Sequence, residues 1–382
     1  MPKKSSFIYL DNNATTRTDT RVVEAMLPYF TEEYANANSS HLFGLTIHEA
    51  ADLAREQVAG LIGAKPKEVT FTSGATEAIN LAIKGLINQP KKHIITVATE
   101  HKAVLDTCAY MQTQGFTVTY LPVKNDGLID LDALENSVTP DTLLVCVMHA
   151  NNETGVLQPI KQISEIAHAK GALFMTDATQ AIGKVAIDVS HLGIDLMPLS
   201  AHKFYGPKGV GALYVSATAK IKLATQLHGG GHERKMRSGT LNVPGIIGLG
   251  RACRIAALEM RFDTKKITAL RDKLENQLLK IDGAFVNGNI EHRLYTTTNI
   301  CFPGVNSEKL ILALGNIAVS SGSACSAVTS EPSYVLKALG LSDADALCSI
   351  RFSPGRFTTI EDIETTVDKV NELVAKQRLT DD

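Results

Sequence analysis

The sequence lacks any apolar run close to the ~20 residues that a helix needs to cross a bilayer, so no membrane-spanning segment is expected. It also lacks an apolar core after the basic residues Lys3 and Lys4, which argues against a secretory signal peptide. Charge of either sign is not in excess, because 38 lysines and arginines stand against 40 aspartates and glutamates. This balance gives no electrostatic reason to bind nucleic acid. We therefore expect a cytoplasmic protein that associates with neither membrane nor nucleic acid.

The six cysteines are scattered and include no Cys-x-x-Cys pair, which is typical of a cytosolic protein with reduced thiols. Cys108, Cys146 and Cys301 lie in apolar segments and are predicted to be small core side chains. We identify no internal repeat and expect no bound metal. The 382 residues, 44% hydrophobic and 20% charged, are sufficient for a large globular domain and a smaller one.

Short apolar runs alternate with amphipathic helical patterns over the first two thirds of the chain. The expected strands are 69–72, 93–97, 143–148, 172–176, 194–199 and 210–215. The expected helices are 48–62, 75–86 and 160–169. This alternation predicts an α/β fold with a mostly parallel central sheet covered by helices on both faces.

The pattern changes near residues 255–265. It predicts a charged helix over 265–280, strands at 299–302 and 349–352, and helices at 307–315 and 360–377. Thr358 and Glu361 are predicted to form a capping box for the last helix. We expect a large domain of residues 16–258 and a smaller α+β domain of residues 259–382, which the N-terminal residues 1–15 join.

Lys203 follows an apolar run and precedes the glycine-rich segment 206–211. Burial lowers the pKa of an amine, and a neutral amine can form a Schiff base with an aldehyde. Taken alone, Lys203 is better explained as an ordinary lysine in a solvated loop.

Polar residues also follow several of the other predicted strands. Residues 73–77 open a helix directly after a strand, which suits a phosphate but is also what a plain N-cap looks like. His101 could stack on a ring, move protons or fill a loop. Asn152 lies in a segment that could be a simple turn. Asp177 follows a buried run and needs a partner, either a protonated pyridine nitrogen, an arginine or a helix N-terminus. Asp177, Lys203 and the phosphate turn together are what a pyridoxal 5'-phosphate (PLP) site needs.

An ordered set of segments along nearly the whole chain resembles the cysteine desulfurases of the NifS/IscS type, within the class V aminotransferases. These segments are 9–16 (YLDNNATT), 73–77 (SGATE), 99–101 (TEH), 151–153 (NNE), 177–180 (DATQ), 200–203 (SAHK), 237–240 (RSGT), 321–325 (SGSAC) and 349–352 (SIRF). The resemblance implies a PLP-dependent transferase of fold type I, and the long segment around Cys325 resembles the long-loop group I.

The resemblance implies a role for each matching residue in holding PLP. Lys203 would carry the cofactor as a Schiff base, Asp177 would pair with the pyridine nitrogen, and Gln180 would contact the ring oxygen. His101 would stack on the ring. The phosphate would be held by Ala75, Thr76, Ser200 and His202, and by Thr240 of the neighbouring subunit, which implies a homodimer.

The resemblance also implies how substrate is bound and cleaved. Asn152 would lie near ring and substrate, and Arg351 would bind the carboxylate of L-cysteine. Lys203 or His101 would remove the Cα proton, and this alternative stays open. The Cys325 thiolate would attack the substrate sulfur, giving L-alanine and a Cys325 persulfide. An iron–sulfur scaffold or a sulfur-relay protein would accept this sulfur.

Composition alone would make Cys325 a free surface cysteine in a run of small polar residues. Other possibilities are another class V PLP enzyme, such as a selenocysteine lyase or an aminotransferase, and a non-catalytic scaffold. Two departures from the family are visible. Residues 35–41 (ANANSSH) differ from its usual Gly-Asn-Pro, and the chain ends at Asp382 without the tail of IscS members, which favours a NifS-like member.

Overall fold

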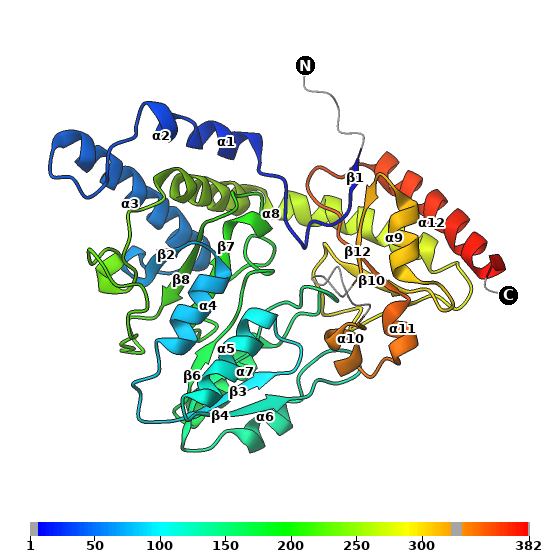
Figure 1. The fold of residues 1–382 in the computed structure, drawn as a ribbon, viewed down its shortest axis with the longest axis horizontal. Helices are drawn as coiled ribbons and strands as arrows, with labels where there is room; N and C mark the ends of the chain where they lie inside the picture. The colour runs from blue at the N-terminus through cyan, green and yellow to red at the C-terminus, as the bar shows by residue number, and fades with distance from the viewer. Residues whose placement is uncertain (1–6, 322–330, 381–382) are drawn as a thin grey trace.

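The computed structural model describes residues 7–321 and 331–380. In this part of the chain the largest sheet has the strand order β2-β8-β7-β6-β5-β3-β4 (Figure 1). Its strands are β2 (Val69–Thr72), β3 (His93–Val97), β4 (Thr117–Leu121), β5 (Thr142–Cys146), β6 (Leu173–Met175), β7 (Leu196–Ser200) and β8 (Gly211–Val215). Strands β4, β3, β5, β6 and β7 run parallel, whereas β8 is antiparallel to both β7 and β2. The predicted α/β fold with a mostly parallel sheet is confirmed.

Helices cover both faces of this sheet because successive strand residues point to opposite sides. Ile94 and Leu144 belong to the apolar cluster that includes helices α4 (Ala75–Lys84) and α5 (Lys102–Thr113). Their neighbours Ile95 and Val145 belong to the cluster on the other face. The helices contributing to that second cluster include α3 (Leu42–Ile62), α6 (Leu131–Ser137), α7 (Ile160–Ala169) and the first part of α8 (Val243–Leu278). Strands buried on both sides explain the continuous apolar runs in the sequence.

Two of the differences from the sequence prediction have identifiable reasons. Helix α3 begins at Leu42 rather than near 48, because His41 caps it and its Nδ1 accepts a hydrogen bond from the Gly44 amide at 3.1 Å. Strand β4 was not predicted. It is the edge strand of the sheet and only Leu121 is fully buried in it, so its sequence has no continuous apolar pattern.

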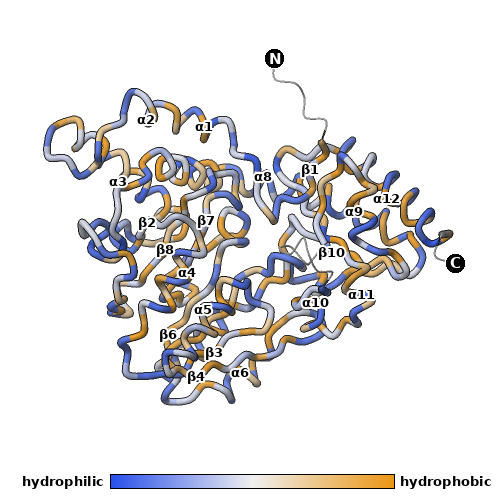
Figure 2. The backbone as a smooth tube through the Cα atoms, viewed as in Figure 1, coloured by the Kyte–Doolittle hydropathy of each residue, from blue (hydrophilic) through white to orange (hydrophobic). Residues whose placement is uncertain are grey.

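A smaller sheet with the order β12-β13-β10-β9 forms a second layer on the right of Figure 1. Its strands are β9 (Phe285–Val286), β10 (Thr298–Cys301), β12 (Ser320–Ser321) and β13 (Ser349–Phe352). Helices α9 (Ser307–Leu314) and α12 (Ile360–Thr380) pack with it in one apolar cluster. Along α12 the tube in Figure 2 alternates between hydrophobic and hydrophilic residues, as expected for a helix with one buried face.

The N-terminal segment lies beside this smaller layer. Strand β1 (Ile8–Tyr9) pairs in parallel with β11 (Ile317–Ala318), and Asp11 forms a bridge with Ser353. Residue 258, the predicted end of the large domain, lies inside α8, which continues into the smaller layer. The division into two domains stays a prediction.

The predicted capping box of α12 is wrong by one residue. Thr359 rather than Thr358 caps the helix, since its Oγ1 accepts a hydrogen bond from the Asp362 amide at 3.2 Å. In return, Asp362 Oδ2 accepts one from the Thr359 amide at 2.9 Å. The Thr358 hydroxyl is already engaged, because it accepts a hydrogen bond from the Gly355 amide.

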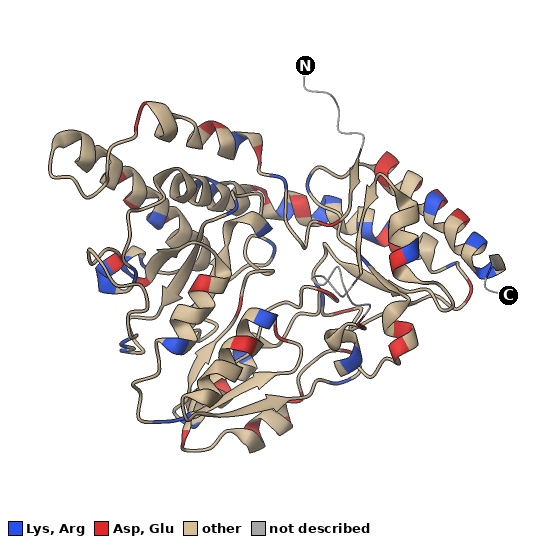
Figure 3. Ribbon diagram, in the orientation of Figure 1, with Lys and Arg blue, Asp and Glu red and all other residues tan. Residues whose placement is uncertain are grey.

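Four further α-helices in the described residues are short. They are α1 (Thr20–Met26), α2 (Pro28–Thr31), α10 (Tyr334–Ala338) and α11 (Asp343–Leu347). Figure 3 shows charges of both signs mixed along α8 and α12. Cys108, Cys146 and Cys301 are buried, as predicted. None of the helices in the described ranges combines the length and the apolar character needed to cross a membrane.

Candidate active site

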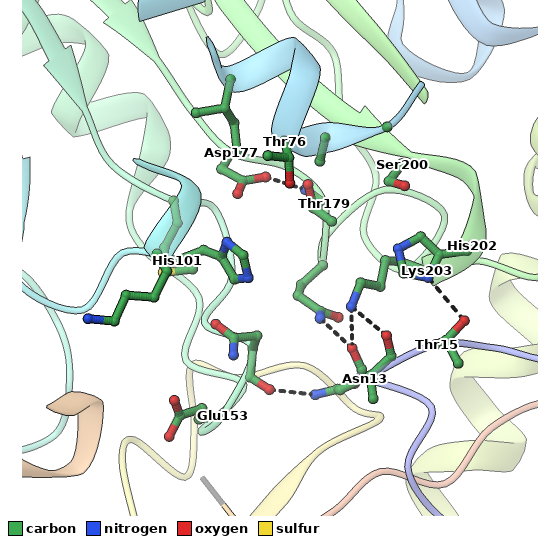
Figure 4. A pocket seen from close by; sticks show the side chains of 18 of the residues that line it. Asn13, Thr15, Thr76, His101, Glu153, Asp177, Thr179, Ser200, His202 and Lys203 are labelled. Carbon is green, nitrogen blue, oxygen red and sulfur yellow. Dashed lines mark hydrogen bonds between the residues drawn. The ribbon is translucent and has the colours of Figure 1, made fainter. Parts of the chain in front are cut away.

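A cavity of about 830 Å³ lies beyond the carboxyl ends of the parallel strands (Figure 4). This is where open α/β sheets bind their ligands. The N-terminal segment and residues 331–334 complete its wall. Ten of the predicted site residues line it: Ala75, Thr76, His101, Asn152, Asp177, Gln180, Ser200, His202, Lys203 and Arg351.

The cavity wall at the start of α4 depends on a close approach of two backbones. Gly74 has a φ of +155° and immediately precedes the helix, whose first amides have no acceptor within the helix. A Cβ on Gly211 would lie 2.8 Å from Gly74 Cα and 2.4 Å from the Leu199 carbonyl oxygen. Only glycine at 211 lets β8 pass this close, so it sets the position of the α4 N-terminus, whose free amides suit an anion.

Lys203 follows β7 in a short turn and its side chain enters the cavity. Its Nζ donates hydrogen bonds to the carbonyl oxygens of Asn13 at 2.7 Å and Ala14 at 2.8 Å. Burial, the largest cause, and the positive charge of Arg351 lower the pKa of Lys203 to about 8, against the opposing charges of Asp11 and Asp177. A substantial fraction of this amine is therefore neutral near pH 8, as a nucleophile requires.

Gln180 connects Lys203 with a second buried lysine. Its Nε2 donates to the same Asn13 carbonyl oxygen at 2.8 Å, and its Oε1 accepts a hydrogen bond from Lys184 Nζ at 2.9 Å. Sequence reasoning gave no role to Asn13 or Lys184. A lysine within the apolar segment 181–187, four residues after Gln180, was the signal that could have found Lys184.

Asp177 follows β6 and His101 follows β3, two parallel strands that are separated in the sheet by β5. Asp177 is buried, and its Oδ1 accepts a hydrogen bond from the Thr179 amide at 2.9 Å. His101 caps α5, with Nδ1 accepting from the Ala103 amide at 3.1 Å, and its ring lies at the cavity (Figure 4). Directly before it, Glu100 is fully buried. Burial raises the pKa of Glu100 well above its ordinary value, and the nearby Asp177 charge adds to this.

Ser200 and His202 lie at the end of the cavity near Gly74. The ring nitrogen Nδ1 of His202 is 3.0 Å from the Thr15 hydroxyl. Burial, together with the charge of Lys203, lowers the pKa of His202 to about 4. The imidazole is therefore neutral at physiological pH and can serve as a hydrogen-bond donor or acceptor rather than as a cation.

Arg351 lies on β13 at the opposite side of the cavity and is 2% exposed. Its Nη2 pairs with Asp11 Oδ1 at 2.6 Å, and its Nη1 donates to the Asn152 carbonyl oxygen at 2.9 Å. A guanidinium held on two sides has a fixed plane, which suits the carboxylate of a small substrate.

Residues 331–334 are joined to the cavity floor by two side chains that sequence reasoning did not single out. The Ser333 hydroxyl donates to Glu153 Oε2 at 2.5 Å, and the Tyr334 hydroxyl donates to the Glu100 carbonyl oxygen at 2.6 Å. Burial raises the pKa of Glu153 to about 7, while the Ser333 hydrogen bond and the Arg351 charge oppose this rise.

Several of the described residues that line the cavity have buried polar atoms without a hydrogen-bond partner, as expected at a ligand-binding site. Within the described residues, Asn152 Oδ1, Thr179 Oγ1 and Arg351 Nε are buried without a hydrogen-bond partner. Burying an unpaired polar atom is unfavourable, so such atoms mark a place for further hydrogen bonds. Together with the Lys203 amine, the Asp177 carboxylate and the amides of α4, they fit a group with an aldehyde, a ring nitrogen and a phosphate. The residues present therefore fit PLP.

Two predicted site residues are not brought to the cavity. Thr240 is exposed and is not among the cavity-lining residues of this chain. Cys325 lies outside the described residues. Their assigned roles stay predictions.

The fold and the site together identify the class. The sequence pattern of the family described as Aminotransferase class-V matches residues 8–366, so the chain belongs to this family. It is 53% identical over 377 residues to the protein named cysteine desulfurase IscS of Pasteurella multocida, and the match covers 97% of this chain and 93% of that protein.

Solved structures show the same similarity. A NifS-like protein is 39% identical with a TM-score of 0.91, covering 97% of this chain and 99% of that chain. A structure titled SspA in complex with cysteine is 38% identical with a TM-score of 0.82, covering 92% and 99%. The predicted resemblance to the NifS/IscS type and the type I fold are confirmed.

Proposed function

We propose that this protein is a PLP-dependent cysteine desulfurase that converts L-cysteine to L-alanine and collects the sulfur on Cys325. The observation that carries the proposal is that the Lys203 amine and the Arg351 guanidinium line the same cavity. The Asp177 carboxylate lines this cavity as well. An amine for an aldehyde cofactor and a fixed guanidinium for a carboxylate define a PLP enzyme that acts on an amino acid.

The cofactor's chemistry is that of an electron sink, which stabilises negative charge at the substrate Cα when PLP is bound. Lys203 would hold its aldehyde carbon, Asp177 its ring nitrogen and Gln180 its ring oxygen. The α4 terminus at Ala75 and Thr76, with Ser200 and His202, would hold its phosphate. His101 would lie against the ring.

The chain's own residues would then bind and orient the substrate. Arg351 would hold the cysteine carboxylate, and the adjacent Asn152 would approach its amino group. The neutral form of Lys203 can accept the Cα proton, since its pKa is lowered to about 8. His101 is the alternative base. Attack of the Cys325 thiolate on the substrate sulfur would form the S–S bond of the persulfide and break the bond from sulfur to Cβ. The electron pair of that bond would stay on the carbon chain, which is protonated to give L-alanine.

The quaternary and cellular parts of the proposal rest on the family. Exposed Thr240 would complete the phosphate site of a second copy, which makes the enzyme a homodimer. An iron–sulfur scaffold or a sulfur-relay protein in the cytoplasm would take the persulfide sulfur. A selenocysteine lyase is the second candidate. It shares the Lys203 and Arg351 arrangement and does not need a thiol at position 325.

The decisive experiment measures alanine formation from L-cysteine in the presence of a thiol reductant, for the native protein and for Cys325→Ser. Alanine from the native protein and almost none from the variant supports the desulfurase. Equal alanine from both refutes the role of Cys325. Turnover of selenocysteine alone by both proteins would establish the lyase instead.

A further inference from the structure

Lys184 is a buried amine close to the proposed cofactor site, and the proposed function does not use it. It is 8% exposed, although lysine is among the residues least often buried. Its Nζ donates to Gln180 Oε1 at 2.9 Å. Burying an ammonium group costs free energy unless the group is paired. A lysine at this position, beside the Gln180 amide of the proposed active site, therefore indicates a role for its hydrogen bond.

The backbone around Lys184 fixes the direction of its side chain. Gly183 precedes it with a φ of +71°, and a Cβ at Gly183 would lie 2.9 Å from the Cβ of Phe204. The turn at Gly183 therefore packs closely against Phe204, the residue that follows Lys203. The Lys184 amide donates to the Ala181 carbonyl oxygen at 3.0 Å, which closes the turn. Lys184 thus approaches Gln180 from a rigid support.

The contact determines which way the Gln180 amide faces. The oxygen and nitrogen ends of a glutamine amide have nearly the same shape, so hydrogen bonds decide its orientation. Lys184 Nζ is a donor, and only Oε1 can accept from it. Nε2 must then face the other way, where it donates to Asn13 at 2.8 Å. Its second hydrogen remains for the cavity, which Gln180 lines.

The surroundings of Lys184 are consistent with a group kept for its hydrogen bond. Burial, the largest cause, and the positive charges of Lys203 and Arg351 together lower the pKa of Lys184 to about 7. Both the neutral and the charged amine can donate to Gln180 Oε1, so the contact is compatible with either form. The charged form, which has no lone pair, excludes the reversed amide, and in the neutral form the hydrogen bond from Nε2 to the Asn13 carbonyl oxygen favours the same orientation.

We infer that Lys184 is a positioning residue that locks the Gln180 amide with its nitrogen toward the cavity, so that the amide donates to the ring oxygen of PLP. This inference rests on the proposed function. Without Lys184, the Gln180 amide can rotate so that Oε1 instead of Nε2 faces the ring oxygen of PLP. Two hydrogen-bond acceptors then face each other, which weakens cofactor binding and alters the electronic state of the ring.

The test is PLP binding to the apo-protein, measured by titration, together with the absorption maximum of the bound cofactor as a function of pH. The variants are Lys184→Met, Gln180→Leu and the double variant, and Lys161→Met on the exposed face of α7 is the control. We expect Lys184→Met to weaken PLP binding about tenfold, the effect of one lost hydrogen bond to a charged group, and to shift the pH dependence of the spectrum. The double variant should be no weaker than Gln180→Leu alone.

Additive losses in the double variant would show that Lys184 does not act through Gln180 and would overturn the inference. So would native-like binding and spectra in Lys184→Met. If Lys184→Met does not fold, Gln180→Glu decides, because it keeps an acceptor for Lys184 and removes the donor. Native-like PLP binding by Gln180→Glu would show that the donor of Gln180 is not needed and would overturn the inference. A tenfold loss of PLP affinity with the shifted spectrum would support it. Failure of the native protein to bind PLP would refute the proposed function, which is a different outcome.

Discussion

The hydroxyl of Ser333 donates a 2.5 Å hydrogen bond to the buried carboxyl group of Glu153. This contact joins the chain just after the segment that contains Cys325 to the loop that carries Asn152. The partners are 180 positions apart in the sequence, and the chain between them includes β6, β7 and β8 of the large sheet and β9, β10 and β12 of the smaller one. A carboxyl group is thus held at the point where residues 331–334 meet the cavity.

The pH dependence of stability should report on Glu153. Burial raises its pKa from 4.5 to about 7, so the folded protein binds a proton that the unfolded chain has released between these values. The stability contribution is full below pH 4.5 and is lost as pH rises through 7. By linkage, the native protein should lose about 3 kcal/mol of unfolding free energy over this range that Glu153→Gln does not lose.

The measurement is urea denaturation of both proteins at pH values from 4.5 to 8. Glu165→Gln, which changes an exposed carboxylate on α7, is the matched control and should follow the native profile. Parallel profiles for the native protein and Glu153→Gln would contradict the prediction.

Lys203→Ala should remove covalent cofactor attachment. Borohydride reduction of the loaded native protein should fix PLP on the peptide containing Lys203, detected by mass spectrometry, and the variant should retain none after denaturation. Turnover of L-cysteine should fall by a factor of about 10³ or more because the nucleophilic amine is lost. Lys208→Ala removes an exposed lysine of the same cavity and should still be labelled at Lys203. Labelling elsewhere would assign the cofactor to another amine.

Arg351→Lys should separate substrate binding from cofactor binding. Lysine keeps the charge near Asp11 but not the planar fork that also donates to the Asn152 carbonyl oxygen. We expect KM for L-cysteine to rise about tenfold and the affinity for PLP to change less than threefold. Steady-state kinetics and PLP titration measure the two effects, with the exposed Arg261→Lys as control. An unchanged KM with a large loss of kcat would place Arg351 outside carboxylate binding.

Gly211→Ala should be destabilising, because its Cβ would meet backbone atoms at 2.4 and 2.8 Å that cannot move independently. We expect a loss of about 2–3 kcal/mol together with weaker PLP binding, since the start of α4 shifts with Gly74. Gly60→Ala in α3 meets no atom within 4 Å and should stabilise by about 0.5–1 kcal/mol, the ordinary helix preference. Thermal unfolding measures both variants, and a neutral Gly211→Ala would contradict the close approach.

The sequence could predict which residues meet at one edge of the sheet, because residues that follow parallel strands lie at the same edge. His101, Asp177 and Lys203 each follow a buried apolar run, and the parallel order of these strands brings their carboxyl ends together. Arg351 could not be placed by this reasoning, since it lies on a small antiparallel sheet. Its function came from the family resemblance alone, and the contact with Asp11 depends on tertiary packing.

Residues that act through packing rather than pattern were missed. Asn13 contributes its carbonyl oxygen, which no sequence pattern of side chains can reveal. Lys184 and Glu153 are buried polar groups whose partners, Gln180 and Ser333, lie outside the regular strands and helices, and their burial depends on the fold of the surrounding segments. The error at Thr358 has the same origin, because the Gly355 turn competes for its hydroxyl.

Helix α8 has a mechanical consequence for catalysis. Its 36 residues form a rod about 54 Å long that runs without interruption from the large sheet to the smaller layer. A hinge between these layers would have to break backbone hydrogen bonds in the middle of the rod. The continuous helix therefore opposes a change in the separation of the walls that carry Lys203 and Arg351. The length of amino acid that fits between these walls depends in part on this helix, which links them outside the cavity.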